Sequence, residues 1–235
     1  MFFHHSQALW ADYPELVPGV LYASGITPNV DVGPQVARFN AIAQTRMASG
    51  PEGELPEVQA WRRTFSKMGL KPTQYRCASE SLLRRFRKEG SLPQLHPLVD
   101  LCNAISLAFA IPIAVFDIDK VQQHLEVRYA TGAENYLTFG GDVEHPEVGE
   151  VIFADATEPA PNAHARRWTN RQSGLSAVSP GTRAVLIVAE ALHTSAAEDV
   201  ARLVSTLAQE LTVTWPTEVK PKTQLLSRDS PRFEF

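Results

Sequence analysis

LVDLCNAISLAFAIPIAVFDIDK, residues 98–120, is the stretch that decides the fold. An apolar segment of helical length, His96 to Ala110, is followed here by a short β-branched segment, Ile113 to Phe116, with Pro112 between the two. A long apolar segment of this kind predicts a buried helix, whereas a short run rich in β-branched side chains predicts an interior strand. We therefore expect a buried helix followed directly by an interior strand.

Helices and strands are predicted from residue 17 to the segment after Ser195. Other helices are predicted over 34–47, 56–68 and 80–89. Ser79 is the expected N-cap of the third of these and Gly90 its end, while Ser195 and Glu198 form a capping-box pattern ahead of an amphipathic helix. Strands are predicted over 17–22, 125–129, 136–139, 151–154, 164–169 and 184–191. The fold class expected is mixed α+β.

The bulk composition favours one large domain. The chain has 235 residues, of which 44% are hydrophobic and 20% charged, so it can bury a sizeable core. No apolar run approaches the roughly 18 residues that span a bilayer, and the first residues lack the pattern of a secretory signal. We expect a cytoplasmic protein without membrane contact. Cys77 and Cys102 lack the spacing of zinc or redox motifs and are expected to be reduced, packed thiols.

Charge is distributed locally rather than globally. The net charge is −4, so the surface as a whole does not favour a polyanionic partner. One basic cluster, within 67–88, is as compatible with a solvated helix face as with binding. In a second cluster three arginines stand beside an aromatic residue, a mixture that can meet phosphate, ribose and base edges together. The nucleic acid-binding candidates are Arg166, Arg167, Trp168 and Arg171.

A series of motif positions extends through residues 99–140. In order they are Val99, Asp100 and Asn103, then Pro112, then Phe116, Asp117, Asp119 and Lys120, then Val127, Arg128 and Ala130, then Gly132, Glu134 and Gly140. At this spacing the segment resembles the B3/B4 editing (tRNA-binding) domain of the β-subunit of bacterial phenylalanyl-tRNA synthetase. The resemblance covers roughly residues 81–192. It implies a single B3/B4-like domain with a mixed, largely antiparallel sheet packed by helices.

The resemblance also suggests a division of the chain. Residues 71–215 are expected to form the B3/B4-like editing domain. Residues 1–70 are expected to form an N-terminal helical extension packed on that core. Residues 216–235 contain three prolines and little periodicity, and are expected to form a C-terminal surface strap or loosely ordered tail.

Conventional catalytic signatures are absent from the sequence. There is no G-x-S-x-G, H-E-x-x-H, Walker or G-x-G-x-x-G motif, and the seven histidines include no pair spaced for one helix face. We therefore expect no metal and no cofactor. This fits the synthetase domain that the chain resembles, where hydrolysis rests on a water positioned by the pocket rather than on a protein nucleophile.

Polar side chains concentrate in residues 164–176. Amide and hydroxyl groups there can bind ribose hydroxyls or an α-amino group and can hold a water against an ester, although a well-capped surface turn would also explain them. Asn103 matches the pocket asparagine of the synthetase domain; alternatively, a buried asparagine joins helix to strand. The catalytic candidates are Asn103, Asn170, Gln172, Ser173 and Ser176.

Three charged residues are candidates for binding the amino acid. Glu190 lies on an otherwise apolar strand, where a carboxylate needs a partner such as an ammonium or hydroxyl group. Arg76 and Glu80 lie at the start of a helix whose N-terminal amides favour anions, with simple capping as the alternative. Ala114 stands where the synthetases carry a pocket histidine, which implies a different amino-acid specificity.

The resemblance favours one function over two others. It implies a trans-editing aminoacyl-tRNA deacylase, with the 3′ acceptor end of a charged tRNA and its amino acid as partners. A tRNA- or RNA-binding module without catalysis is the first alternative, and a sensor that binds a free amino acid is the second. The oligomeric state, the amino acid and the tRNA are not predicted.

Overall fold

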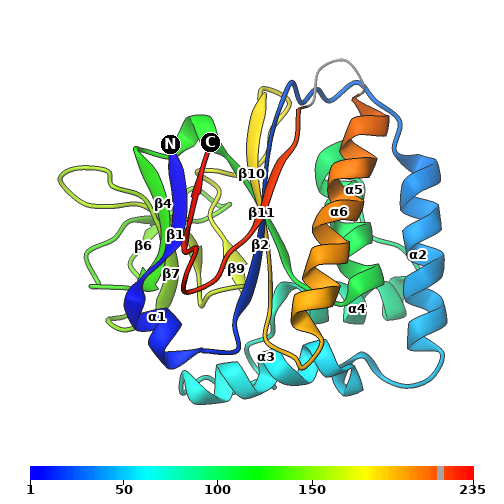
Figure 1. Ribbon diagram of the computed structural model, residues 1–235, viewed down its shortest axis with the longest axis horizontal. Helices are drawn as coiled ribbons and strands as arrows, with labels where there is room; N and C mark the ends of the chain where they lie inside the picture. The colour runs from blue at the N-terminus through cyan, green and yellow to red at the C-terminus, as the bar shows by residue number, and fades with distance from the viewer. Residues whose placement is uncertain (216–219) are drawn as a thin grey trace.

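The protein has three layers: a six-stranded sheet, a four-stranded sheet and a group of helices (Figure 1). A computed structural model describes residues 1–215 and 220–235. One apolar core lies between the two sheets and a second lies between the four-stranded sheet and the helices. The four-stranded sheet is therefore covered on both faces.

The first layer is a sheet in which one strand pair is parallel. In spatial order its strands are β12 (Arg232–Glu234), β1 (Phe2–His5), β4 (His124–Tyr129), β7 (Val151–Ala154), β8 (Ala163–Arg166) and β9 (Arg171–Gln172). Strands β1 and β4 run parallel and the other neighbours run antiparallel. The two ends of the described chain thus lie side by side at one edge of this sheet.

The middle layer is antiparallel throughout. Its order is β11 (Lys222–Leu225), β2 (Val17–Ser24), β10 (Ala184–Ala191) and β3 (Ile113–Asp117), and a separate pair is formed by β5 (Tyr136–Leu137) and β6 (Val143–Glu144). Alternation along β10 sends Val185 and Ile187 to the helices and Leu186 and Val188 to the other sheet. A strand buried on both faces has to be a continuous apolar run, as this one is.

Helices supply the third layer and close one end of the molecule. Helices α5 (Pro97–Phe109) and α6 (Ala196–Thr214) cover the middle sheet, and α2 (Gly33–Met47) packs against α5 on the side away from the sheet (Figure 1). The remaining helical elements are α1 (Gln7–Asp12), η1 (Glu52–Glu54), α3 (Pro56–Lys67), α4 (Ala78–Glu89) and η2 (Ile118–Lys120). Within the described residues, no helix has the length and apolar character needed to cross a membrane.

The α+β class and the largely antiparallel sheets are confirmed, but both ends of the chain differ from expectation. Residues 1–70 contribute the predicted strand β2 and also β1, which was not predicted, so they form part of both large sheets; residues 222–234 add an edge strand to each large sheet. The four residues 216–219 of the expected tail lie outside the described residues. An edge strand is paired on one side only, and backbone groups make this pairing. Its side chains therefore need not follow a clear apolar pattern in the sequence.

Two helix starts also differ from the sequence prediction. Helix α4 begins at Ala78 with Cys77 as its N-cap, and the Ala78 N–H donates to the carbonyl of Thr169 at 2.8 Å. Ser79 is therefore inside the helix. Ser195 is the N-cap of α6, but its hydroxyl bonds to the Asp199 carboxylate at 2.7 Å and not to the helix backbone. Both cysteines are buried free thiols.

Gly19 sets the distance between β2 and helix α6. A Cβ atom at this position would lie 2.5 Å from Val200 Cγ1 and 2.5 Å from Val204 Cγ2, both on buried, β-branched side chains. We expect Gly19→Ala to lower the free energy of unfolding by about 1–3 kcal/mol, because a packed core resists added volume. Gly181→Ala, where the nearest atom would be 3.6 Å away, is the matched control and is expected to change stability by less than about 0.5 kcal/mol. Urea denaturation of the two variants measures the difference; equal stabilities would contradict this packing.

Candidate functional site

A pocket of about 340 Å³ opens between helix α5, strands β3 and β9, and the segment before β10. Helix α5 presents Asn103 one turn after Val99, so both side chains face the same side. Strand β9, about 70 residues further along the chain, contributes Gln172 to the same pocket. The lining consists of Leu95, His96, Val99, Cys102, Asn103, Ile113, Val115, Phe139, Gln172, Ala177, Val178 and Pro180. A mostly apolar cavity with a few polar groups is typical of a small-ligand site.

The two amides of the pocket differ in how they are held. Gln172 donates from Nε2 to the carbonyl oxygen of Val115 at 2.6 Å, which fixes its carboxamide against strand β3. Asn103 is half-buried, and its side chain makes no hydrogen bond to any residue in the described part of the chain. The Asn103 carboxamide therefore keeps both its donor and its acceptor for a ligand.

The two serine candidates lie behind the pocket wall, and both are fully buried. Ser173 donates from Oγ to the carbonyl of Leu137 at 2.8 Å and accepts from the Leu175 N–H at 3.1 Å. The hydroxyl of Ser176 has no hydrogen-bond partner among the described residues, while its backbone carbonyl accepts from the Asp117 N–H at 2.9 Å. Of the two hydroxyls, only that of Ser176 is uncommitted.

The start of helix α4 is joined to the polar loop. Asn170 donates from Nδ2 to the backbone carbonyl of Arg76 at 2.7 Å. Glu80 is fully buried and is held by Arg62 at 2.6 Å and by Arg76 at 3.4 Å. Arg76 and Asn170, which lie far apart in sequence, are thus neighbours, but their polar groups bond to each other and to Glu80 rather than lining the 340 Å³ pocket.

Glu190 faces the core between the two sheets, on the same side of β10 as Val188, as strand alternation predicts. Its carboxylate lies 2.6 Å from His5 Nε2 and accepts from Trp168 Nε1 at 3.1 Å. It lines a hollow of about 60 Å³ that shares Gln172 with the larger pocket. The chain itself therefore supplies the partners that this buried carboxylate needs.

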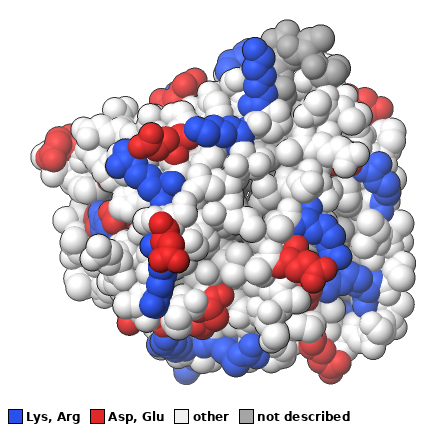
Figure 2. Space-filling model, in the orientation of Figure 1, with Lys and Arg blue, Asp and Glu red and all other residues white. Residues whose placement is uncertain are grey.

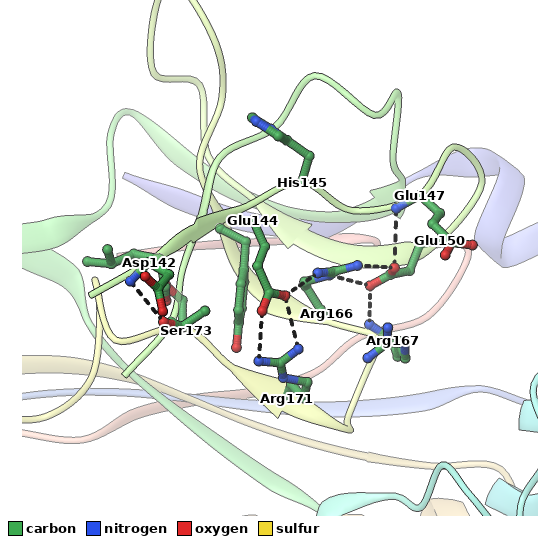
Figure 3. A network of polar contacts seen from close by, with 12 residues as sticks. Asp142, Glu144, His145, Glu147, Glu150, Arg166, Arg167, Arg171 and Ser173 are labelled. Carbon is green, nitrogen blue, oxygen red and sulfur yellow. Dashed lines mark hydrogen bonds and ion pairs between the residues drawn. The ribbon is translucent and has the colours of Figure 1, made fainter. Parts of the chain in front are cut away.

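The four RNA-binding candidates divide between the interior and the surface. The Arg166 guanidinium is buried, with Glu150 at 2.8 Å and Glu144 at 2.7 Å, and Trp168 is fully buried (Figure 3). Arg171 also bonds to Glu144 at 3.0 Å but is 37% exposed. The Arg167 guanidinium lies 4.7 Å from the centre of the Tyr75 ring. Of the four, Arg167 and Arg171 retain exposed surface, whereas Arg166 and Trp168 belong to the packed interior.

Two residues that line the pocket, His96 and Phe139, were not predicted from the sequence. His96 is the N-cap of α5, where its Nδ1 accepts from the Leu98 N–H at 3.2 Å, and burial lowers the pKa of the ring. The proton of the neutral ring therefore sits on Nε2, which is buried without a partner in the described structure and belongs to a residue lining the pocket. Phe139 is 74% exposed at the pocket rim. The signals available were a histidine directly before Pro97 and an aromatic residue in a glycine-rich turn.

The fold and the pocket define a class of protein: an α+β domain of two packed sheets with an amide-lined pocket beside a buried helix. Residues 60–211 match the model of the family described as B3/4 domain, and the chain belongs to that family.

Comparison with curated proteins adds relatives of one kind. The chain is 28% identical over 78 residues to the phenylalanine–tRNA ligase β subunit of Legionella pneumophila (strain Lens), covering 33% of this chain and 10% of that protein. The Haemophilus influenzae β subunit (strain KW20) is 26% identical over 90 residues, covering 38% and 11%. The chain thus spans about a tenth of the length of these relatives.

Among solved structures, an N-terminal fragment of the phenylalanyl-tRNA synthetase β-subunit from Pyrococcus horikoshii is similar with a TM-score of 0.46 and 10% sequence identity. The match covers 95% of this chain and 53% of that one.

The Arg166–Glu150 pair provides a test of which arginines serve the fold. We expect Arg166→Ala to lower the free energy of unfolding by about 3–5 kcal/mol, because it leaves the 7%-exposed Glu150 carboxylate without its partner. Arg171→Ala is the control and should cost less than about 1 kcal/mol, because this pair is partly solvated. Chemical denaturation at pH 7 measures both; similar losses would contradict the division into interior and surface arginines.

The same pair predicts a pH dependence. Burial raises the pKa of Glu150, but hydrogen bonds and the charge of Arg166 outweigh burial, so the pKa is lowered overall. A lowered folded-state pKa contributes stability that is present above the unfolded pKa of about 4.3 and is lost as the pH falls through the folded value. The stability difference between wild type and Arg166→Ala should therefore be constant from pH 6 to 7 and shrink below about pH 4. Denaturation curves across this range test the trend.

Proposed function

We propose that this protein is a trans-editing aminoacyl-tRNA deacylase that acts in the cytoplasm and hydrolyses the ester between a wrong amino acid and the terminal adenosine. The observation that carries the proposal is that Asn103 and Gln172, from distant parts of the chain, line one pocket of about 340 Å³. Membership in the B3/4 family and similarity to synthetase β subunits support an aminoacyl-tRNA substrate.

The pocket composition suits an aminoacyl ester. Its apolar wall, with Val99, Ile113 and Val178, can receive the amino-acid side chain, and its volume admits one amino acid with part of the ribose. The Asn103 and Gln172 amides can hold the α-amino group and a water molecule. Attack of that water on the ester carbonyl forms a new C–O bond, the bond to the ribose oxygen breaks, and a proton of the water passes to the ribose oxygen. The partnerless Nε2–H of His96 is a candidate donor to the developing oxyanion.

Electrostatics support a local contact with the tRNA end rather than a broad basic footprint. Basic and acidic side chains are interspersed on the face shown in Figure 2, and the net charge is −4. Arg167 and Arg171 retain exposed surface near the loop that leads to Gln172, where they can meet one or two phosphates. Affinity for uncharged tRNA is therefore expected to be weak and to fall with salt.

Deacylation of a panel of correctly and incorrectly charged tRNAs tests this function. We expect the purified protein to hydrolyse only certain aminoacyl esters, and Asn103→Ala to lower the rate by about 10²-fold or more, as loss of a positioned donor does. Gln224→Ala is the matched control, because Gln224 lies on β11 at the edge of the sheet opposite to β3. The activity should survive a chelator, since within the described residues no group of three possible metal ligands lines the pocket.

Two outcomes would overturn the proposal. If no ester in the panel is hydrolysed while tRNA binding is intact, the protein is a binding module. If Asn103→Ala and Gln224→Ala hydrolyse equally well, the chemistry lies outside this pocket.

Phe139 provides a second test of the tRNA substrate. An aromatic ring that is 74% exposed at the pocket rim can stack on the terminal base, an interaction worth about 1–3 kcal/mol per base. We expect Phe139→Ala to lower kcat/KM about 5- to 150-fold while Phe139→Trp stays near wild type. The control is Val148→Ala, a 79%-exposed apolar side chain that does not line the pocket. Equal rates for the alanine and tryptophan variants would exclude stacking.

Binding of a free amino acid is the second candidate function. It is favoured by the pairing of Arg166 and Arg171 with Glu144, which neutralises part of the charge available for RNA. A ligand that binds only the native state raises the melting temperature. A thermal shift with a free amino acid, together with no hydrolysis of any charged tRNA, would favour this sensor.

A further inference from the structure

Two histidines and a glutamate lie side by side on the outer face of the six-stranded sheet. Parallel pairing of β1 with β4 sets His4 opposite Glu126 and Phe2 opposite His124. The alternate residues of the two strands, Phe3 and Leu125, point into the core between the sheets. His4, His124 and Glu126 therefore share the opposite face, although 120 residues separate the two histidines.

The three side chains present their donor atoms to one another. One nitrogen of each histidine and one carboxylate oxygen lie within 4.8 Å of each other, and His4 Nε2 is 3.8 Å from Glu126 Oε1. The Phe2 ring stacks on His124 with 4.8 Å between centroids and 3° between planes, which fixes the plane of that imidazole. In the described structure, none of the three side chains makes a hydrogen bond within 3.5 Å. Their lone pairs are therefore uncommitted.

Neighbouring arginines do not cancel the attraction for a cation, because carboxylates pair with them. Arg128 approaches Glu126 at 3.7 Å, but its Nη1 is bound to the buried Glu134 at 2.5 Å. Arg232 lies over the Phe2 ring at 3.6 Å and bonds to Glu234 at 3.1 Å.

We propose that His4, His124 and Glu126 bind one first-row divalent cation, with Zn²⁺ the best match to two imidazoles and one carboxylate. Zinc bonds of about 2.0–2.2 Å place tetrahedral donors about 3.4 Å apart, so the donor atoms, now within 4.8 Å of one another, have to approach by about 1 Å to complete the site. A hollow of about 660 Å³, lined by His4, Glu126, Gln7 and Arg228, adjoins these donors. A water or another small ligand can occupy the fourth position from that side.

A second group of possible metal ligands differs because its donor atoms already have partners within the chain. Glu57, His193 and Asp199 also lie within 4.8 Å of one another. However, Arg46 binds Glu57 at 2.6 Å, and His193 binds Asp199 at 2.9 Å. These donors already have partners within the chain, so this group supports no metal proposal.

The metal site is independent of the proposed deacylase activity. It lies on the outer face of the six-stranded sheet, and it shares no lining residue with the pocket that holds Asn103 and Gln172. Removal of the metal is therefore expected to leave ester hydrolysis unchanged, so either proposal can fail without the other.

Metal binding to tag-free, full-length protein tests the site. Native mass spectrometry and competition with a chromophoric chelator are expected to show one Zn²⁺ per chain, with no binding of Mg²⁺. His4→Ala and His124→Asn should each weaken binding at least about tenfold, and Co²⁺ should give the visible absorption of a tetrahedral centre that His124→Asn abolishes. His145→Ala, which removes an exposed histidine elsewhere, is the control and should bind as wild type does.

The result that would overturn the site is equally direct. Absence of stoichiometric Zn²⁺ binding to the wild-type protein, or unchanged affinity in the His4→Ala and His124→Asn variants, would exclude it. Thermal melts of the metal-free variants verify folding, and Glu126→Gln provides a third variant that removes the carboxylate charge at nearly constant volume.

Discussion

Hydrogen bonds to one buried carboxylate join strand β10 to distant parts of the fold. Glu190 is 2% exposed and is the second-last residue of the apolar strand β10, a position that is costly for a charged group unless it is paired. His5 from β1 and the Trp168 indole from the turn after β8 both reach it, and Trp61 of α3 donates to its backbone carbonyl at 3.2 Å. Strand β1, the turn after β8 and helix α3 thus converge on one residue of β10.

This convergence shapes the segment that carries the candidate site. To place the Trp168 indole on Glu190, the chain turns inward, and Arg167 and Trp168 take the left-handed conformation with φ of 46° and 56°. Glycine adopts this conformation readily, whereas residues with a side chain rarely do. Two large side chains with positive φ therefore indicate that tertiary packing overrides the backbone preference of these residues. The turn ends β8 at Arg166 and starts β9, which delivers Gln172 to the pocket. The predicted strand over 164–169 stops early for the same reason.

The sequence predicted best those helices and strands whose burial is visible as a pattern of apolar residues within the element itself. Strands β7 and β10 have the predicted bounds. Helices α2, α3 and α5 agree with their predicted bounds to within one residue at both ends, because apolar periodicity and flanking Pro or Gly residues define them. Strands β1, β11 and β12 escaped prediction, since each has four residues or fewer and such short strands carry little pattern; β11 and β12 are in addition edge strands. In the polar loop, composition indicated hydrogen bonding but not which partner each group takes, so Ser173 and Ser176 could not be told apart. Only the folded chain shows that one hydroxyl is bonded and the other is not.

Strand β1 connects the interior with the outer surface. Because strand neighbours point to opposite faces, His5 reaches inward to Glu190 while His4 stands outward beside Glu126. A shift of β1 by one residue on β4 would exchange these faces, breaking the contact between His5 and Glu190 and separating His4 from His124. Any ligand that joins His4 to β4 binds only the correct register and therefore stabilises it by mass action. The cost of burying Glu190 and the geometry of the outer histidines are consequently linked through the register of a single four-residue strand.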